Sequence, residues 1–126
     1  MAREELNVEG YKQRALKEVR QMVKLLREDA LALCASRAYY AVFYAIKAAL
    51  ENIGVKTGSH KQTHVEFRKH FIKTQKLDKK YSKILTELFE IRSSADYDIN
   101  WSTNKMFVER IVKQAKELIE NILNVS

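Results

Sequence analysis

A short polar stretch, IRSSADYDIN (residues 91–100), places chemically useful side chains beside the apolar seam of an expected helix. Arg92 can hold a phosphate or a carboxylate with a planar fork of donors. Asp96, Tyr97 and Asp98 supply carboxylate and phenol oxygens within six residues of it. The stretch therefore indicates either an anion-binding site or an internal network of ion pairs.

A second arginine, Arg37, lies in the apolar segment SRAYYAVFYAIKAAL. Helical spacing puts its guanidinium within reach of the phenol rings of Tyr40 and Tyr44. A structural role is also open, because a buried arginine is stable when a carboxylate from another helix pairs with it. If both arginines face one cleft, they can bind a nucleotide or RNA. The candidate binding residues are Arg37, Tyr40, Arg92, Asp96 and Tyr97.

Positive charge is concentrated in one part of the chain. Residues 56–83 hold nine lysines or arginines against two acids, a net charge of +7 that equals the formal charge of the whole chain. Such a surface attracts RNA or an acidic protein, although a solvated helix face is the commoner meaning of a charge run. The segment has no nucleic-acid-reading motif. The candidate basic surface consists of Lys69, Lys73, Lys76 and Lys80.

Two histidines, His60 and His64, have the four-residue spacing of paired zinc ligands on a helix. No third ligand is apparent, and Lys61 stands where the metalloprotease pattern has glutamate. We therefore expect both rings to edge the core or an interface, with no metal. The chain also has no glycine-rich phosphate loop or Ser-His-Asp set, and we expect no cofactor.

The composition predicts one helical domain over residues 1–126. A length of 126 residues with 46% hydrophobic residues suits a single core. The longest apolar stretch contains Arg37 and Lys47 and follows no secretory leader, so we expect neither a membrane span nor export. The single cysteine, Cys34, cannot form an intramolecular disulfide. We expect it to be a buried thiol in a cytoplasmic protein.

Helices must position these side chains, because the chain has no proline and only three glycines. We expect them near residues 4–28, 30–53, 59–74, 78–97 and 102–124, with Ser59 and Gln62 forming a capping box at the third. Apolar residues recur at intervals of three and four, which predicts an all-α, up-and-down antiparallel bundle of four to five helices. The second helix, apolar nearly all round, should be central. The expected seams include Leu16, Val19, Val23 and Leu26 in the first helix, and Val108, Ile111, Ala115, Leu118 and Ile122 in the last.

Three stretches in order, SRAYYAVFYAIKAAL, GSHKQTHVEFRKHF and LFEIRSSADYD, resemble the HEPN domain (higher eukaryotes and prokaryotes nucleotide-binding) over nearly the whole chain. The resemblance implies a helical bundle that forms a homodimer. It also implies a gene neighbour encoding a minimal nucleotidyltransferase, in a toxin–antitoxin pair.

The nuclease branch of that family carries an arginine followed, after four to six residues, by a histidine. Here the positions that follow Arg92 at that spacing are Tyr97, Asp98 and Ile99, so the chain resembles the branch that lacks the usual catalytic histidine. Imidazole accepts and donates protons near neutral pH, whereas phenol has a reference pKa of about 10. Tyr97 is better suited to donating a hydrogen bond to a phosphate oxygen.

These observations favour the binding of a nucleotide or RNA over the cleavage of RNA. The expected function is a regulatory subunit that binds a nucleotide or RNA, or docks a nucleotidyltransferase, without chemistry of its own. One alternative is a metal-independent endoribonuclease whose cleft works through Arg92 and Tyr97. Another is a structural helical dimer whose basic surface docks an acidic protein.

Overall fold

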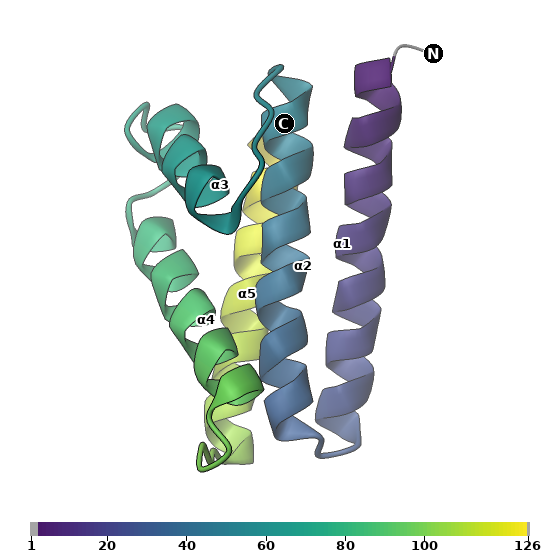
Figure 1. Cartoon of the computed structure of the whole chain (residues 1–126), viewed down its shortest axis with the longest axis vertical. Coiled ribbons are helices and arrows are strands. Elements are labelled where there is room, and N and C mark those ends of the chain that lie inside the picture. The colour runs from purple at the N-terminus through teal and green to yellow at the C-terminus, as the bar shows by residue number, and fades with distance from the viewer. Residues whose placement is uncertain (1–2, 126) are drawn as a thin grey trace.

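The computed structural model describes the backbone of residues 3–125 and the side chains of residues 7–125. The elements are α1 (Arg3–Arg27), α2 (Leu31–Asn52), α3 (His60–Phe67), the π-helix η1 (Arg68–Ile72), α4 (Lys80–Tyr97) and α5 (Lys105–Val125). The described residues contain no strand, which confirms the predicted all-α bundle (Figure 1).

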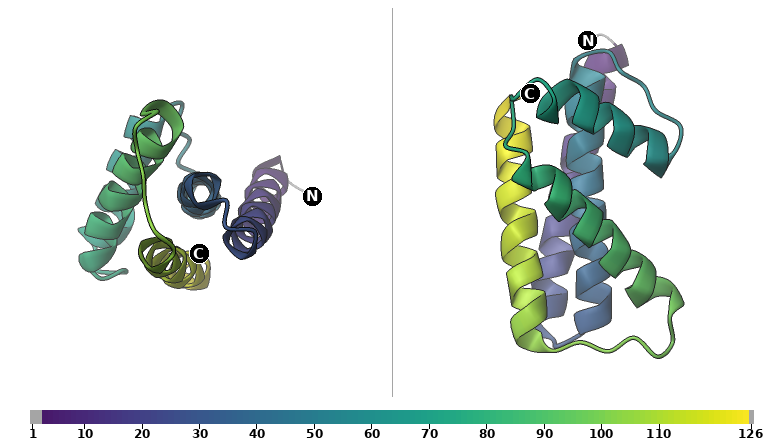
Figure 2. Two further views of the ribbon diagram at one scale, coloured as in Figure 1. Left: turned by 90° about the horizontal axis from the view of Figure 1, so that it is seen from below. Right: turned by 90° about the vertical axis from the view of Figure 1, so that its left-hand side faces the viewer.

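Helix α2 lies at the centre of the bundle, as its composition predicts. It packs against α1 on one side and against α4 and α5 on the other, while α3 crosses near its C-terminal half (Figures 1 and 2). Its buried residues occupy all sides of the helix, because an element with neighbours all round has no face to expose to water. This position brings Arg37 and Tyr39 close to side chains from three other elements.

The third expected helix, residues 59–74, is only partly correct. Its α-helical part ends at Phe67 and continues as the π-helix η1, in which the amide of Lys73 donates to the carbonyl of Arg68 at 2.8 Å. Phe67 and Phe71 are both buried. A π-turn needs no glycine or proline, so the sequence gives no punctuation that would predict it.

The predicted cap of α3 is confirmed in one half. The Gln62 amide donates to Ser59 Oγ at 3.0 Å, as expected. The returning bond differs, because Gln62 Oε1 accepts from the amide of Gly58 at 2.8 Å rather than from that of Ser59. The two bonds together fix the start of α3 against the preceding loop and so set the position of His60.

The apolar seam of α5 is buried throughout, as predicted. That of α1 is correct only in part, because Val19 and Leu26 pack against the core while Leu16 does not. On α1 the fully buried side chains are Ala15 and Met22, while Leu16 is 40% exposed. No helix of the described residues has the length and apolarity needed to cross a bilayer.

Candidate anion-binding site

Arg92 is buried on the last turns of α4, with 7% of its surface exposed. Its guanidinium carbon lies 5.2 Å from the ring centroids of Tyr39 and Tyr40, 5.3 Å from that of Phe89 and 6.0 Å from that of Tyr97. The negative faces of aromatic rings attract a cation at these distances. Helices α2 and α4 thus surround this charge with rings.

No carboxylate neutralises that charge within the described residues. None of their ion pairs includes Arg92, and its buried Nε has no hydrogen-bond acceptor. Asp96 and Asp98 are exposed, and Asp98 instead accepts from the amide of Asn100. The ion-pair network considered for Arg92 is therefore not observed, and a buried charge without such a partner is costly.

Arg37 differs from Arg92 because it has a counter-ion. Its Nη1 lies 3.2 Å from a carboxylate oxygen of Glu18 on α1, an ion pair of the kind that a structural role requires. Its guanidinium carbon is also 4.7 Å from the Tyr40 ring centroid. Tyr40 therefore contacts both arginines, and the structure brings together four of the five candidate binding residues. Asp96 forms no ion pair with them.

His60 and His64 lie close enough to Arg92 for its charge to affect them, whereas the sequence predicted only that they edge the core or an interface. The Tyr39 hydroxyl is 2.7 Å from Nδ1 of His60 and 2.8 Å from Nε2 of His64. A hydroxyl has a single proton, so it donates to one ring nitrogen and accepts from the other. The two imidazoles and the phenol thus form one hydrogen-bonded chain, defined here as the His60–Tyr39–His64 chain.

The surroundings keep both imidazoles neutral near pH 7. Burial, then the positive charges of Arg68, His60 and Arg92, lower the pKa of His64 to about 4. Burial and the charge of Arg92 also lower the pKa of His60. Burial raises the pKa of Tyr39, although Arg92 opposes the shift. A neutral imidazole can accept a proton, which is the property missing from the positions after Arg92.

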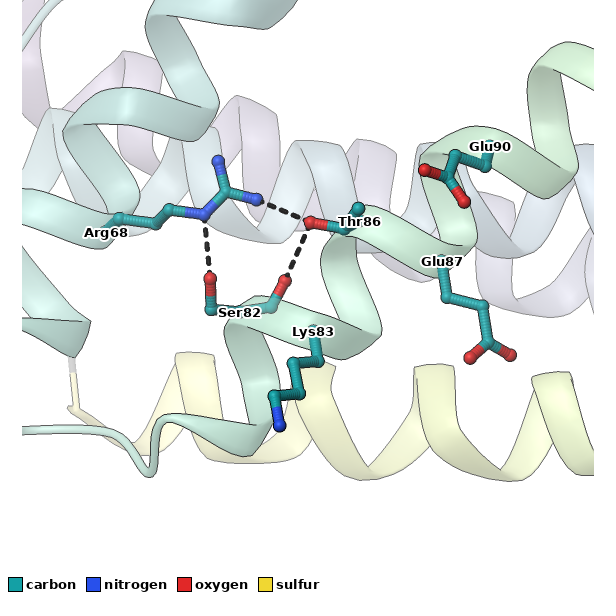
Figure 3. Close-up of a pocket in the computed structure, with 6 residues that line it drawn as sticks. All are labelled: Arg68, Ser82, Lys83, Thr86, Glu87 and Glu90. Carbon is teal, nitrogen blue, oxygen red and sulfur yellow. Dashed lines mark hydrogen bonds between the residues drawn. The ribbon is translucent and has the colours of Figure 1, made fainter.

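The basic surface lies apart from this site and is exposed. Lys69, Lys73, Lys76 and Lys80 all face solvent, and Lys80 pairs with Glu117 at 3.3 Å. Arg68 of the same segment has donors already engaged, since its Nε reaches Ser82 Oγ at 2.7 Å and its Nη2 reaches Thr86 Oγ1 at 2.8 Å (Figure 3). The hollow beside it also holds Glu87 and Glu90, so its lining has mixed charge.

Other expected groups have ordinary structural surroundings. Cys34 is a buried thiol that donates to the Met22 carbonyl at 3.2 Å, and burial raises its pKa to about 11. His70 bonds to Glu66 at 3.0 Å and so lies away from the other two histidines. Among the described residues, no cluster of three or more His, Cys, Asp or Glu side chains could hold a metal ion.

Comparison with known proteins agrees with this architecture. A UPF0332 protein of Thermotoga maritima is 31% identical over 97 residues, covering 77% of this chain and 74% of its own. Two proteins of Methanocaldococcus jannaschii are also similar. "Putative toxin MJ0142" is 29% identical over 79% of this chain and 68% of its own, and "Putative toxin MJ0605" is 31% identical over 75% of each. The family model of the HEPN domain matches residues 8–125, and the chain therefore belongs to the HEPN domain family.

Proposed function

We propose that the chain binds a nucleotide or an RNA segment at the Arg92 site, and that it serves as a regulatory subunit in a toxin–antitoxin-like module. The observation that carries the proposal is the buried guanidinium of Arg92, which has no carboxylate partner and an Nε without an acceptor. A phosphate oxygen is an acceptor that would satisfy both the charge and the free N–H. The word "toxin" in the names of two relatives supports the module.

Access to the site depends on Tyr97. This residue is 76% exposed, and its ring centroid lies 6.0 Å from the guanidinium carbon of Arg92, so little packing holds the ring in place. A rotation of Tyr97 would uncover the guanidinium, and its phenol could then donate to the bound phosphate. Tyr40 offers a second ring at the same point.

The test is the affinity of the purified protein for adenosine monophosphate and for a short single-stranded RNA. Arg92→Gln removes a charge-assisted contact and should weaken both by about ten-fold or more. Arg110→Gln is the matched control, since that arginine is exposed and pairs with Glu87. Equal binding by the natural chain and Arg92→Gln, with both folded by thermal melt, would contradict the proposal.

Metal-independent RNA cleavage is a second candidate function, which the position of His60 favours. The ring lies beside Tyr39 and Tyr40, both of which contact Arg92, and the free nitrogen Nε2 has no partner among the described residues. As general base it would take the proton of a ribose 2′-hydroxyl. The 2′-oxygen would then attack phosphorus and the bond to the 5′-oxygen would break. That oxygen would take up a proton from water, giving a 2′,3′-cyclic phosphate and a 5′-hydroxyl end.

This second function predicts cleavage of RNA in the presence of a metal chelator, strongly reduced in His60→Gln. Tyr39→Phe should reduce it less, since the ring remains while its hydroxyl is lost. His70→Gln is the matched control. If the natural protein leaves RNA intact while binding it, the regulatory function stands alone.

The assembly belongs to the same proposal. Apolar side chains are exposed where α2 begins, α4 ends and α5 begins, the end of the bundle at which these three termini meet in Figure 1. They are Leu33, Tyr97, Ile99 and Met106, with exposures of 60%, 76%, 97% and 82%. We infer that a homodimer covers them, and that pairing places two Arg92 sites near one another. Light scattering should give a dimer that the double change Ile99→Glu and Met106→Glu dissociates.

The partner is a minimal nucleotidyltransferase, acting with this chain in the cytoplasm. The test of this partner is whether the neighbouring reading frame encodes a nucleotidyltransferase, and whether the two encoded proteins co-purify. A neighbour of another class, together with a failure to co-purify, would remove this part of the proposal and leave ligand binding untouched.

A further inference from the structure

A hollow of about 220 Å³ lies between the N-terminal half of α1, the C-terminal half of α2 and the start of α3. Arg92 and the basic surface do not line it. We propose that this hollow binds a phosphate group, either inorganic phosphate or the terminal phosphate of a larger molecule. The residues that carry the inference are Arg14, Lys47, Tyr11, Tyr44 and the segment 57–60.

Lys47 supplies a buried positive charge without a described counter-ion. The residue is 9% exposed, and Nζ donates to the carbonyl of Thr57 at 2.8 Å and to its hydroxyl at 3.1 Å. The Tyr11 ring centroid is 5.2 Å away. These contacts satisfy hydrogen bonds but leave the net charge uncompensated, a condition that an anion in the hollow would relieve.

Arg14 supplies a second positive charge on the opposite wall. Its guanidinium carbon lies 4.7 Å from the Tyr44 ring centroid, and the group forms no hydrogen bond or ion pair with a described residue. Tyr44 in turn stacks on Tyr11 at 6.3 Å between ring centroids. Arg14 and Lys47 thus line the same hollow, and the planar fork of donors of Arg14 stays available for phosphate.

The described carboxylates of α1 and α2 are engaged elsewhere. Glu9 accepts from Gln13, Glu18 pairs with Arg37, and Glu51 pairs with Lys56. The start of α3 adds a favourable dipole, because the amides of a first helical turn point out of its N-terminus. No carboxylate of the described residues lines the hollow, and Arg14 and Lys47 both bring positive charge to it.

The size of the hollow sets the ligand class. Sites for drug-sized ligands occupy roughly 300–1,000 Å³, so about 220 Å³ suits a phosphate with at most part of a sugar. A nucleoside or chain attached to that phosphate would extend outward past Arg14, which is exposed.

The experiment is calorimetric titration of the full chain with inorganic phosphate, adenosine monophosphate, and one RNA oligomer bearing either a 5′-phosphate or a 5′-hydroxyl. Arg14→Gln and Lys47→Met should each weaken phosphate binding by about ten-fold, whereas Arg20→Gln, an exposed arginine on the same helix, should not. Amide chemical shifts should move at residues 57–63 on addition of phosphate and stay in place at residues 92–97.

The ligands compared in this titration distinguish which kind of molecule supplies the phosphate group. A preference for the 5′-phosphorylated oligomer over the 5′-hydroxyl form identifies an RNA end, and equal affinity for inorganic phosphate and the nucleotide identifies the free ion. The inference is overturned by absence of phosphate binding, by equal losses in Arg14→Gln and Arg20→Gln, or by loss in Arg92→Gln with Arg14→Gln unaffected. The last result would also support the Arg92 site, and retained phosphate binding in Arg92→Gln separates the two sites. Lys47→Met can disturb packing because Lys47 is buried. The result for the surface change Arg14→Gln is therefore the one that decides whether the hollow binds phosphate.

Discussion

The Arg92 site and the basic surface place positive charge in opposite surroundings. Arg92 is 7% exposed, lies among four rings and has no carboxylate partner in the described chain. The basic-surface lysines face solvent, where water and salt screen them. One buried charge can therefore matter more for a small anion than several exposed ones, while the exposed ones govern long-range attraction.

The largest expected difference is in affinity for a mononucleotide. Arg92→Gln should cost roughly 1.5 to 3 kcal/mol of binding free energy, because a hydrogen bond to a charged group is lost in a partly dry site. The combined change of Lys69, Lys73 and Lys76 to glutamine should alter the same affinity by less than about two-fold at physiological salt. Equilibrium titration of both proteins compares them directly. A larger loss in the triple lysine variant would reverse the comparison.

Stability at acid pH tests whether the site is as dry as the packing indicates. Since the pKa of His64 falls from 6.5 to about 4 on folding, its contribution is fully present above pH 6.5 and is lost as the pH drops toward 4. As the pH falls, His64 is protonated in the unfolded chain before it is protonated in the folded one. This lowers the free energy of unfolding by about 2 kcal/mol between pH 7 and pH 5. Urea unfolding at the two pH values measures it.

The control for that measurement is a matched histidine. His64→Gln should remove most of the loss between pH 7 and pH 5 and leave the part due to His60, whose pKa is also lowered. His70→Gln, at a half-buried position bonded to Glu66, should retain the full loss. The same acid-induced loss in His64→Gln and in the natural chain would mean that His64 is protonated in the folded state.

The smallest expected effect concerns the salt dependence of RNA binding. If the basic surface contacts single-stranded RNA, removing three lysines should lower the slope of log affinity against log salt by about 2, with little change from any single lysine. Arg92→Gln should change that slope by about one counter-ion or less. An unchanged slope in the triple variant would mean that the basic surface is only a solvated helix face.

The sequence by itself determined the helical bundle and the positions of its main elements. With no proline and three glycines, periodic apolar residues leave helices as the consistent solution, and the α5 seam is buried as expected. The α1 seam shows the limit, because Val19 and Leu26 pack against the core as predicted while Leu16 is 40% exposed. The fully buried positions of α1 are instead Ala15 and Met22, a small residue and a flexible one, which close packing favours and periodicity alone does not rank.

Only the tertiary structure decided which polar groups meet. Spacing put His60 and His64 on one face of a helix, but their shared partner, the Tyr39 hydroxyl, is 21 and 25 residues away in the chain. The pairing of Arg37 with Glu18, rather than with Asp96, likewise depends on how α1 lies against α2. Helical periodicity is a local property, whereas a contact between helices depends on their crossing and rotation, which the whole core sets.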